Sequence, residues 1–166
     1  MTTREDRRTP RLGGWGFEGE SFDPPEPMLD GLRRELGKTE PFPWPDAEAM
    51  VAVVPKPIEV GDLGSADVST DPLDRLRHAR GQGTPDLMRL RSGTIRHLPD
   101  AVVRPSDDDE LETVLRSASD RGFRVVPWGG GTSVTGGVNL VPDDRPALVV
   151  DLERFSGLLD LDEVSG

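Results

Sequence analysis

Prolines are unevenly distributed along this 166-residue chain, and they limit what its first part can fold into. Nine of the sixteen prolines precede residue 60. The segments Asp23-Pro-Pro-Glu-Pro27 and Pro41-Phe-Pro-Trp-Pro45 cannot lie inside a helix or a central strand, because proline lacks a backbone N–H group. Leucine spacing predicts a short helix over 28–36, and a second one is expected within 71–80. We therefore interpret residues 1–98 as a loop-rich N-terminal arm with short helices that lies on a larger body.

From residue 99 onward the pattern is more regular. Ala101-Val-Val-Arg104 is a short apolar run typical of a strand. Ser106 is a suitable N-cap for a helix that Gly122 would end. Apolar residues at helical spacing within this segment predict one buried face, and they are Leu111, Val114, Leu115 and Ala118. Phe123-Arg-Val-Val126 then predicts a second strand, so that 99–126 should form a β-α-β unit with parallel strands.

Two further apolar runs follow. Ala147-Leu-Val-Val150 predicts a buried third strand beside the first one, and Leu158-Leu-Asp-Leu161 predicts the beginning of a fourth. The chain then reaches Gly166, and we expect the domain to be incomplete at that point. The predicted fold class is α+β, with 1–98 as the arm and 99–166 as the first, incomplete subdomain of a larger domain.

Charge and composition argue against several classes of protein. The chain has 31 acidic and 20 basic residues, so its net charge is −11, and nucleic acid is not an expected partner. It contains no cysteine, which excludes disulfides and cysteine-ligated metals within the chain. No run approaches the ~18 apolar residues that would span a bilayer. We expect a cytoplasmic protein without a membrane span.

Glycines after the second predicted strand form the main candidate site. In the stretch from Gly129 to Gly137, the absence of Cβ atoms would let successive backbone amides converge on one anion. Thr132 and Ser133 add hydroxyl donors, and the set would suit a pyrophosphate. A sharp turn without any ligand is the alternative interpretation.

Two common phosphate-binding motifs are excluded. The nucleoside-triphosphate P-loop needs a Gly-Lys-Ser/Thr sequence, and no lysine follows Lys56. The Rossmann fingerprint starting at Gly129 would need a glycine at position 134, which is a valine.

The segment Pro127-Trp-Gly-Gly-Gly-Thr-Ser-Val134 resembles the flavin-pyrophosphate loop of the vanillyl-alcohol-oxidase type, or PCMH-type, FAD-binding domain. Pro99-Asp-Ala-Val-Val-Arg-Pro105 resembles the opening of that domain. The segments Gly14-Trp-Gly-Phe17 and Arg89-Leu-Arg-Ser-Gly93 are similar to those of the alkyldihydroxyacetonephosphate synthase-like branch of the family.

The resemblance implies that the loop binds the pyrophosphate of FAD. The implied cofactor-binding residues are Pro127, Trp128, Gly129, Gly130, Gly131, Thr132 and Ser133. Some relatives attach flavin covalently through a histidine at the position of Thr132. Because threonine cannot form that bond, we expect non-covalent FAD.

The resemblance also implies an enzyme whose catalytic and substrate-binding residues lie beyond Gly166. The leading expectation is the FAD-binding portion of an alkyldihydroxyacetonephosphate synthase-like enzyme of ether lipid biosynthesis, acting on a small-molecule or lipid substrate. These 166 residues alone should be inactive, and a homodimer is a further expectation. The alternatives are an FAD-dependent D-2-hydroxyacid dehydrogenase or oxidase on the same scaffold, and a non-catalytic fragment.

Three further features could suggest chemistry, but we assign none to them. His78 and His97 have no suitable catalytic neighbour in the sequence, so each is interpreted as a surface or hydrogen-bonded residue. The acidic run Asp107-Asp-Asp-Glu110 is explained by the positive end of the helix dipole rather than by a metal. The sequence thus predicts neither a catalytic residue nor a metal ligand within this chain.

Overall fold

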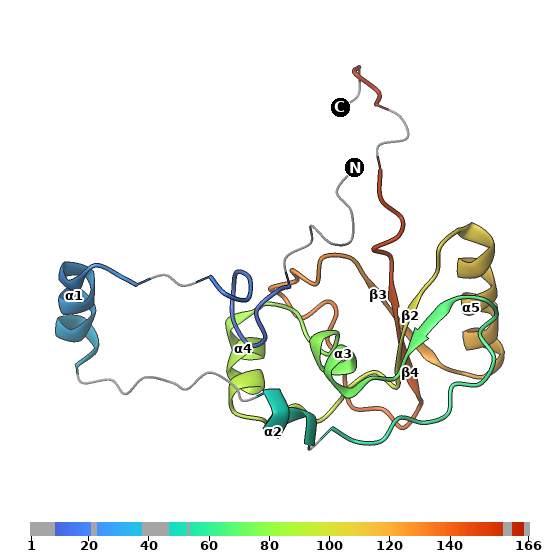
Figure 1. The fold of residues 1–166 in the computed structure, drawn as a ribbon, viewed down its shortest axis with the longest axis horizontal. Coiled ribbons are helices and arrows are strands. Elements are labelled where there is room, and N and C mark those ends of the chain that lie inside the picture. The colour runs from blue at the N-terminus through green and yellow to red at the C-terminus, as the bar shows by residue number, and fades with distance from the viewer. Residues whose placement is uncertain (1–8, 21–22, 38–46, 53, 158–160, 165–166) are drawn as a thin grey trace.

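A small mixed sheet forms the centre of the computed structural model, which describes residues 9–20, 23–37, 47–52, 54–157 and 161–164 (Figure 1). The strand order is β1-β2-β4-β3. The strands are β1 (Asp67–Ser69), β2 (Ala101–Arg104), β3 (Arg124–Trp128) and β4 (Ala147–Asp151). The β1 strand is antiparallel to β2, whereas β2, β4 and β3 are parallel to one another.

The predicted β-α-β unit is confirmed, and the third predicted strand lies beside the first. Val149 of β4 pairs with Val102 of β2 on one side and with Val126 of β3 on the other. Because β4 is an inner strand, all five of its residues are buried. A continuous apolar run is therefore the sequence that this position requires.

The helix α5 (Asp108–Asp120) connects β2 to β3 and packs on the sheet through Val114 and Ala118. Its predicted C-terminal stop is confirmed, since Gly122 follows the helix with a φ of 69°. The predicted N-cap at Ser106 is wrong. Asp107 is the cap, and its Oδ1 accepts a hydrogen bond from the amide of Glu110 at 2.9 Å. Aspartate caps a helix as well as serine does, and the helix begins one residue later than expected.

Residues before 99 contribute to the same core. Val60, Leu63 and Ala66 pack in the cluster that holds α5 against the sheet. The β1 strand extends the sheet from the N-terminal side of the predicted boundary. The division into an arm (1–98) and an FAD-binding subdomain (99–166) stays a prediction.

Among the residues that the structure describes, four helices precede the parallel strands: α1 (Glu26–Leu36), α2 (Ala47–Ala52), α3 (Pro72–Arg77) and α4 (Thr84–Arg91). The two helices predicted within 28–36 and 71–80 are thus present as α1 and α3. No residue of α1 is buried, whereas Met50, Leu76 and Leu90 join α2, α3 and α4 in a second core cluster. The strand predicted over 158–161 falls on residues outside those described.

Among the described residues, no helix is both long enough and apolar enough to span a bilayer.

Candidate functional site

A cleft of about 910 Å³ opens where β3 ends and the glycine loop begins. Its walls come from several separate segments of the chain. The lining residues include Trp128, Gly129, Gly130 and Gly131 of the loop, His78, Arg80, Gly81 and Gln82 between α3 and α4, and Pro10, Arg11 and Leu12 near the N-terminus. The carboxyl ends of parallel strands are the usual place for ligands in sheets of this kind.

The glycine loop presents unpaired backbone donors at this cleft. Gly129 and Gly130 are exposed. Among the described residues, no hydrogen bond is donated by the amides of Gly129, Gly130 or Gly131. A side chain at Gly129 would meet no atom within 4 Å, and one at Gly130 would meet only the Thr132 methyl at 3.6 Å. The loop therefore has room for a ligand and donors to bind it.

Gly131 is a glycine for a different reason. Its φ of 65° lies in the left-handed region, and a Cβ atom there would collide with the ring of Trp128. The indole is buried, so it cannot move aside easily. Gly131 thus sets the path of the backbone, while Gly129 and Gly130 leave space in the cleft.

The seven predicted binding residues do not all face the cleft. Trp128 and the three glycines line it, whereas Pro127, Thr132 and Ser133 are not among its lining residues. Ser133 instead fastens the loop: its carbonyl accepts from the Gln82 amide at 2.7 Å, and its Oγ accepts from the Gly137 amide at 3.0 Å. Whether these residues bind a cofactor stays a prediction.

The segment between α3 and α4 packs against the glycine loop and supports it. Gly81 packs so closely on the Ser133 carbonyl that any side chain at residue 81 would collide with it. The Gly81 amide donates to Oδ1 of Asn139 at 3.0 Å, and Nδ2 of Asn139 donates to Asp86 at 2.7 Å. This support was not predicted, and Gly81-Gln-Gly83 before α4 was the available sequence signal.

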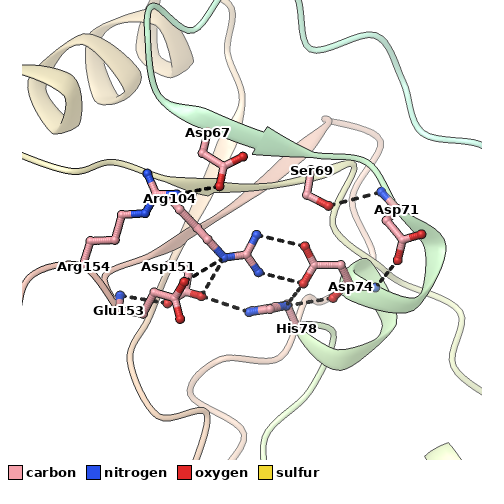
Figure 2. Close-up of polar contacts among 9 residues, drawn as sticks. All are labelled: Asp67, Ser69, Asp71, Asp74, His78, Arg104, Asp151, Glu153 and Arg154. Carbon is pink, nitrogen blue, oxygen red and sulfur yellow. Dashed lines mark hydrogen bonds and ion pairs between the residues drawn. The ribbon is translucent and has the colours of Figure 1, made fainter. Parts of the chain in front are cut away.

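A buried charged cluster lies in the same cleft (Figure 2). The ring of His78 lies between two carboxylates, with Nε2 3.3 Å from Oδ2 of Asp151 and Nδ1 3.2 Å from Oδ1 of Asp74. Arg104 donates two hydrogen bonds to Asp74, at 2.9 and 2.7 Å, and its Nε lies 3.3 Å from Asp151. We call these four residues the His78 cluster.

One neighbour of His78 is local, since Asp74 lies four residues earlier in the chain. The other, Asp151, is 73 residues away along the chain and could not be found from the sequence. The interpretation of His78 as a hydrogen-bonded residue is confirmed. His97 is half-buried in the connection between α4 and β2.

Electrostatics favour a charged His78. Burial by itself would lower the pKa of His78, but the hydrogen bonds with Asp151 and Asp74 outweigh burial and raise the pKa to about 9. Burial would raise the pKa of Asp74, but hydrogen bonds from His78 and Arg104 hold it well below the usual range. An imidazolium held between carboxylates at neutral pH is suited to fixing geometry and is a poor general base.

The acidic run at 107–110 is the first turn of α5. Asp107 caps the helix, and Oε2 of Glu110 accepts from the Ser106 amide at 2.8 Å. In the part of the chain that the structure describes, no group of three or more histidine, aspartate or glutamate side chains is placed to hold a metal ion.

Comparison with protein families identifies the class of this protein. Residues 99–166 match the family described as the FAD binding domain. This part of the chain therefore corresponds to an FAD-binding domain, and FAD is the cofactor.

Within that class, the chain is similar to the N-terminal portion of alkyldihydroxyacetonephosphate synthases. It is 34% identical over 151 residues to the synthase of Trypanosoma brucei brucei, covering 84% of this chain and 25% of that protein. It is also 31% identical over 117 residues to Protein Rv2250A of Mycobacterium tuberculosis, covering 63% of this chain and 76% of that protein.

A solved alkyldihydroxyacetonephosphate synthase has the same fold over this region. It superimposes with a TM-score of 0.74 and 23% identity, covering 93% of this chain and 34% of the synthase. The chain thus spans a quarter to a third of these two synthases. The α+β architecture is that of the synthase FAD-binding domain, as the sequence predicted.

The loop satisfies the chemical requirements for the FAD diphosphate. Its free amides supply donors for phosphate oxygens, and the open positions at Gly129 and Gly130 allow the backbone to approach them. Both features are observed in the structure of this chain, and neither depends on the family match.

Proposed function

We propose that the loop 127–133 binds the diphosphate of FAD non-covalently, within an enzyme of the alkyldihydroxyacetonephosphate synthase type. The observation that carries this proposal is the set of unpaired amides at Gly129, Gly130 and Gly131 beside a cleft of about 910 Å³. Amides that donate to phosphate oxygens form charge-assisted hydrogen bonds, which are stronger than those between neutral groups.

The roles within the loop differ. Gly129, Gly130 and Gly131 donate from the backbone, and Trp128 forms the wall behind them. Thr132 is exposed and its hydroxyl is available as a further donor. Ser133 holds the loop closed through its bonds with Gln82 and Gly137.

Bound FAD would supply the flavin ring as the reacting group, and these residues would supply binding and orientation. The His78 cluster would keep Trp128, and with it the start of the loop, in position. Residues that act on a substrate are expected outside this chain.

Titration of the ¹⁵N-labelled chain with FAD, ADP and riboflavin, followed by NMR of the backbone amides, tests the binding proposal. FAD and ADP share a diphosphate that riboflavin lacks. The amide signals of the three glycines should therefore shift with FAD and ADP and stay in place with riboflavin. Unchanged glycine signals at saturating FAD would contradict the assignment of the loop.

The proposed reaction of the complete enzyme is the exchange of a fatty acid for a fatty alcohol on a lipid precursor, without net oxidation. This proposal rests on the similarity to the synthases. Flavin-containing protein isolated from its native cells should incorporate a labelled long-chain alcohol. Anaerobic bleaching of the flavin by D-2-hydroxy acids, without alcohol incorporation, would instead indicate a dehydrogenase.

Two further expectations accompany this proposal. A homodimer would be detected by sedimentation of the flavin-containing protein, and cytoplasmic localisation by fractionation of the native cells.

A further inference from the structure

Arg80 is a buried cation with incomplete pairing. It lies between α3 and α4 and lines the cleft, and its side chain is only 10% exposed. Its Nε atom is fully buried and has no hydrogen-bond partner among the described residues. The nearest carboxylate oxygen, Oδ1 of Asp86, lies 3.6 Å from NH1, which is outside hydrogen-bond distance.

Asp86 makes no hydrogen bond with Arg80, and it has other partners. The same Oδ1 accepts a hydrogen bond from Nδ2 of Asn139 at 2.7 Å, and it also lies 3.6 Å from NH1 of Arg89. Burial of a guanidinium without hydrogen bonds is unfavourable, so a structure that retains one often uses it for a ligand.

Two other arginines that line the cleft have hydrogen bonds at the ends of their side chains. Arg104 donates to both oxygens of Asp74, and NH2 of Arg77 donates to Glu18 at 2.6 Å, although the Nε of Arg77 is buried without a partner, as in Arg80. Arg80 makes no hydrogen bond within the described part of the chain.

Arg80 belongs to the segment between α3 and α4 that packs against the glycine loop. Gly81, the next residue, packs on the Ser133 carbonyl and bonds to Asn139. The cleft is therefore lined by two sets of unsatisfied donors, the guanidinium of Arg80 and the amides of Gly129, Gly130 and Gly131. Both sets require a ligand with several acceptor oxygens.

We propose that Arg80 is an anion-binding residue that donates to a phosphate of FAD while the loop amides bind the diphosphate. This inference rests on the proposed function of the loop. It adds a cationic contact from a residue that precedes the segment 99–166. Guanidinium and phosphate form short, charge-assisted and often bidentate hydrogen bonds, and a buried guanidinium is already oriented for them.

The test follows the Nε–Hε signal of Arg80 and the three glycine amides in the ¹⁵N-labelled chain. The ligands are FAD, ADP, riboflavin and dihydroxyacetone phosphate, the last as a single-phosphate probe. FAD and ADP should shift both sets of signals, riboflavin should shift neither, and the single phosphate should be at least tenfold weaker than ADP.

Variants measure the contribution of the side chain. Arg80→Ala should weaken ADP and FAD about tenfold or more, and Arg80→Lys should retain part of the affinity because the charge remains. Arg89→Ala is the matched control, since Arg89 lies at the same distance from Asp86 and is not among the residues lining the cleft. It should change the affinity less than twofold, and amide spectra would verify that each variant is folded.

The outcomes separate this inference from the proposed function. Glycine signals that shift while Arg80 stays unchanged, with wild-type affinity in Arg80→Ala, would overturn the inference and leave the loop assignment standing. Glycine signals that do not shift would overturn both. An Arg80 that responds to dihydroxyacetone phosphate better than to ADP would show that it serves a substrate phosphate, which also contradicts the proposal.

Discussion

The imidazole of His78 packs against the indole of Trp128, with ring centroids 4.9 Å apart and ring planes inclined by 53°. His78 follows α3, and Trp128 is the last residue of β3 before the glycine loop. The contact joins the buried charged cluster to the proposed cofactor loop. Changes in the cluster should therefore affect both stability and the shape of the loop.

Protonation of His78 should make stability depend on pH. The folded-state pKa of about 9 lies above the unfolded value of about 6.5. The stabilisation is thus fully present below pH 6.5 and is lost as pH rises through about 9. We expect the free energy of unfolding to fall by roughly 3 kcal/mol between pH 6.5 and 9.5, as measured by urea denaturation.

Two variants test the source of that pH dependence. His78→Gln should remove most of it, because glutamine does not titrate. His97→Gln should keep the wild-type profile. An unchanged slope in His78→Gln would assign the effect to other groups.

Gly130→Val should prevent FAD binding without unfolding the chain. The new side chain would point into open space near the Thr132 methyl, so it would compete with the ligand rather than with the protein. FAD titration followed by flavin fluorescence measures the effect. Gly31→Val in the exposed helix α1 is the control, and retention of FAD by Gly130→Val would contradict the loop assignment.

Gly131→Ala should destabilise the fold by about 1–3 kcal/mol. Alanine is disfavoured at a φ of 65°, and its Cβ would collide with Trp128. Gly129→Ala, whose Cβ would meet no atom within 4 Å, should be nearly neutral. Thermal melting of both variants measures the difference. Equal melting temperatures would contradict this prediction.

Asp107→Ala should lower the free energy of unfolding by about 1 kcal/mol, because the Glu110 amide loses its acceptor. Asp108→Ala serves as the control, since Asp108 is exposed and does not cap the helix. Urea denaturation distinguishes them. A larger loss of unfolding free energy in Ser106→Ala than in Asp107→Ala would indicate that Ser106 is the cap.

Residues 1–166 alone should bind FAD with a Kd weaker than micromolar and show no activity. The chain corresponds to 34% of the solved synthase, so the remainder of that protein has no counterpart here to enclose a flavin ring. Isothermal titration with FAD provides the measurement. A stoichiometric complex of sub-micromolar affinity would show that this chain is a self-sufficient flavin module.

The sequence alone determined the features that depend on local interactions. Apolar spacing predicted α5, since one helix face must be buried on the sheet. The uninterrupted run at 147–150 predicted a buried strand, and the glycines at 129–131 predicted a loop with accessible amides. Each of these depends on residues within a few positions of one another.

Tertiary structure decided the features that depend on distant residues. The pairing of β1 with β2, the contact of His78 with Asp151, and the burial of Arg80 beside the loop have no local signature. A buried charge is costly unless partners meet it, and the path of the chain decides which distant segments can supply them. The sequence could therefore indicate the glycine loop, whereas only the fold could show which side chains surround it.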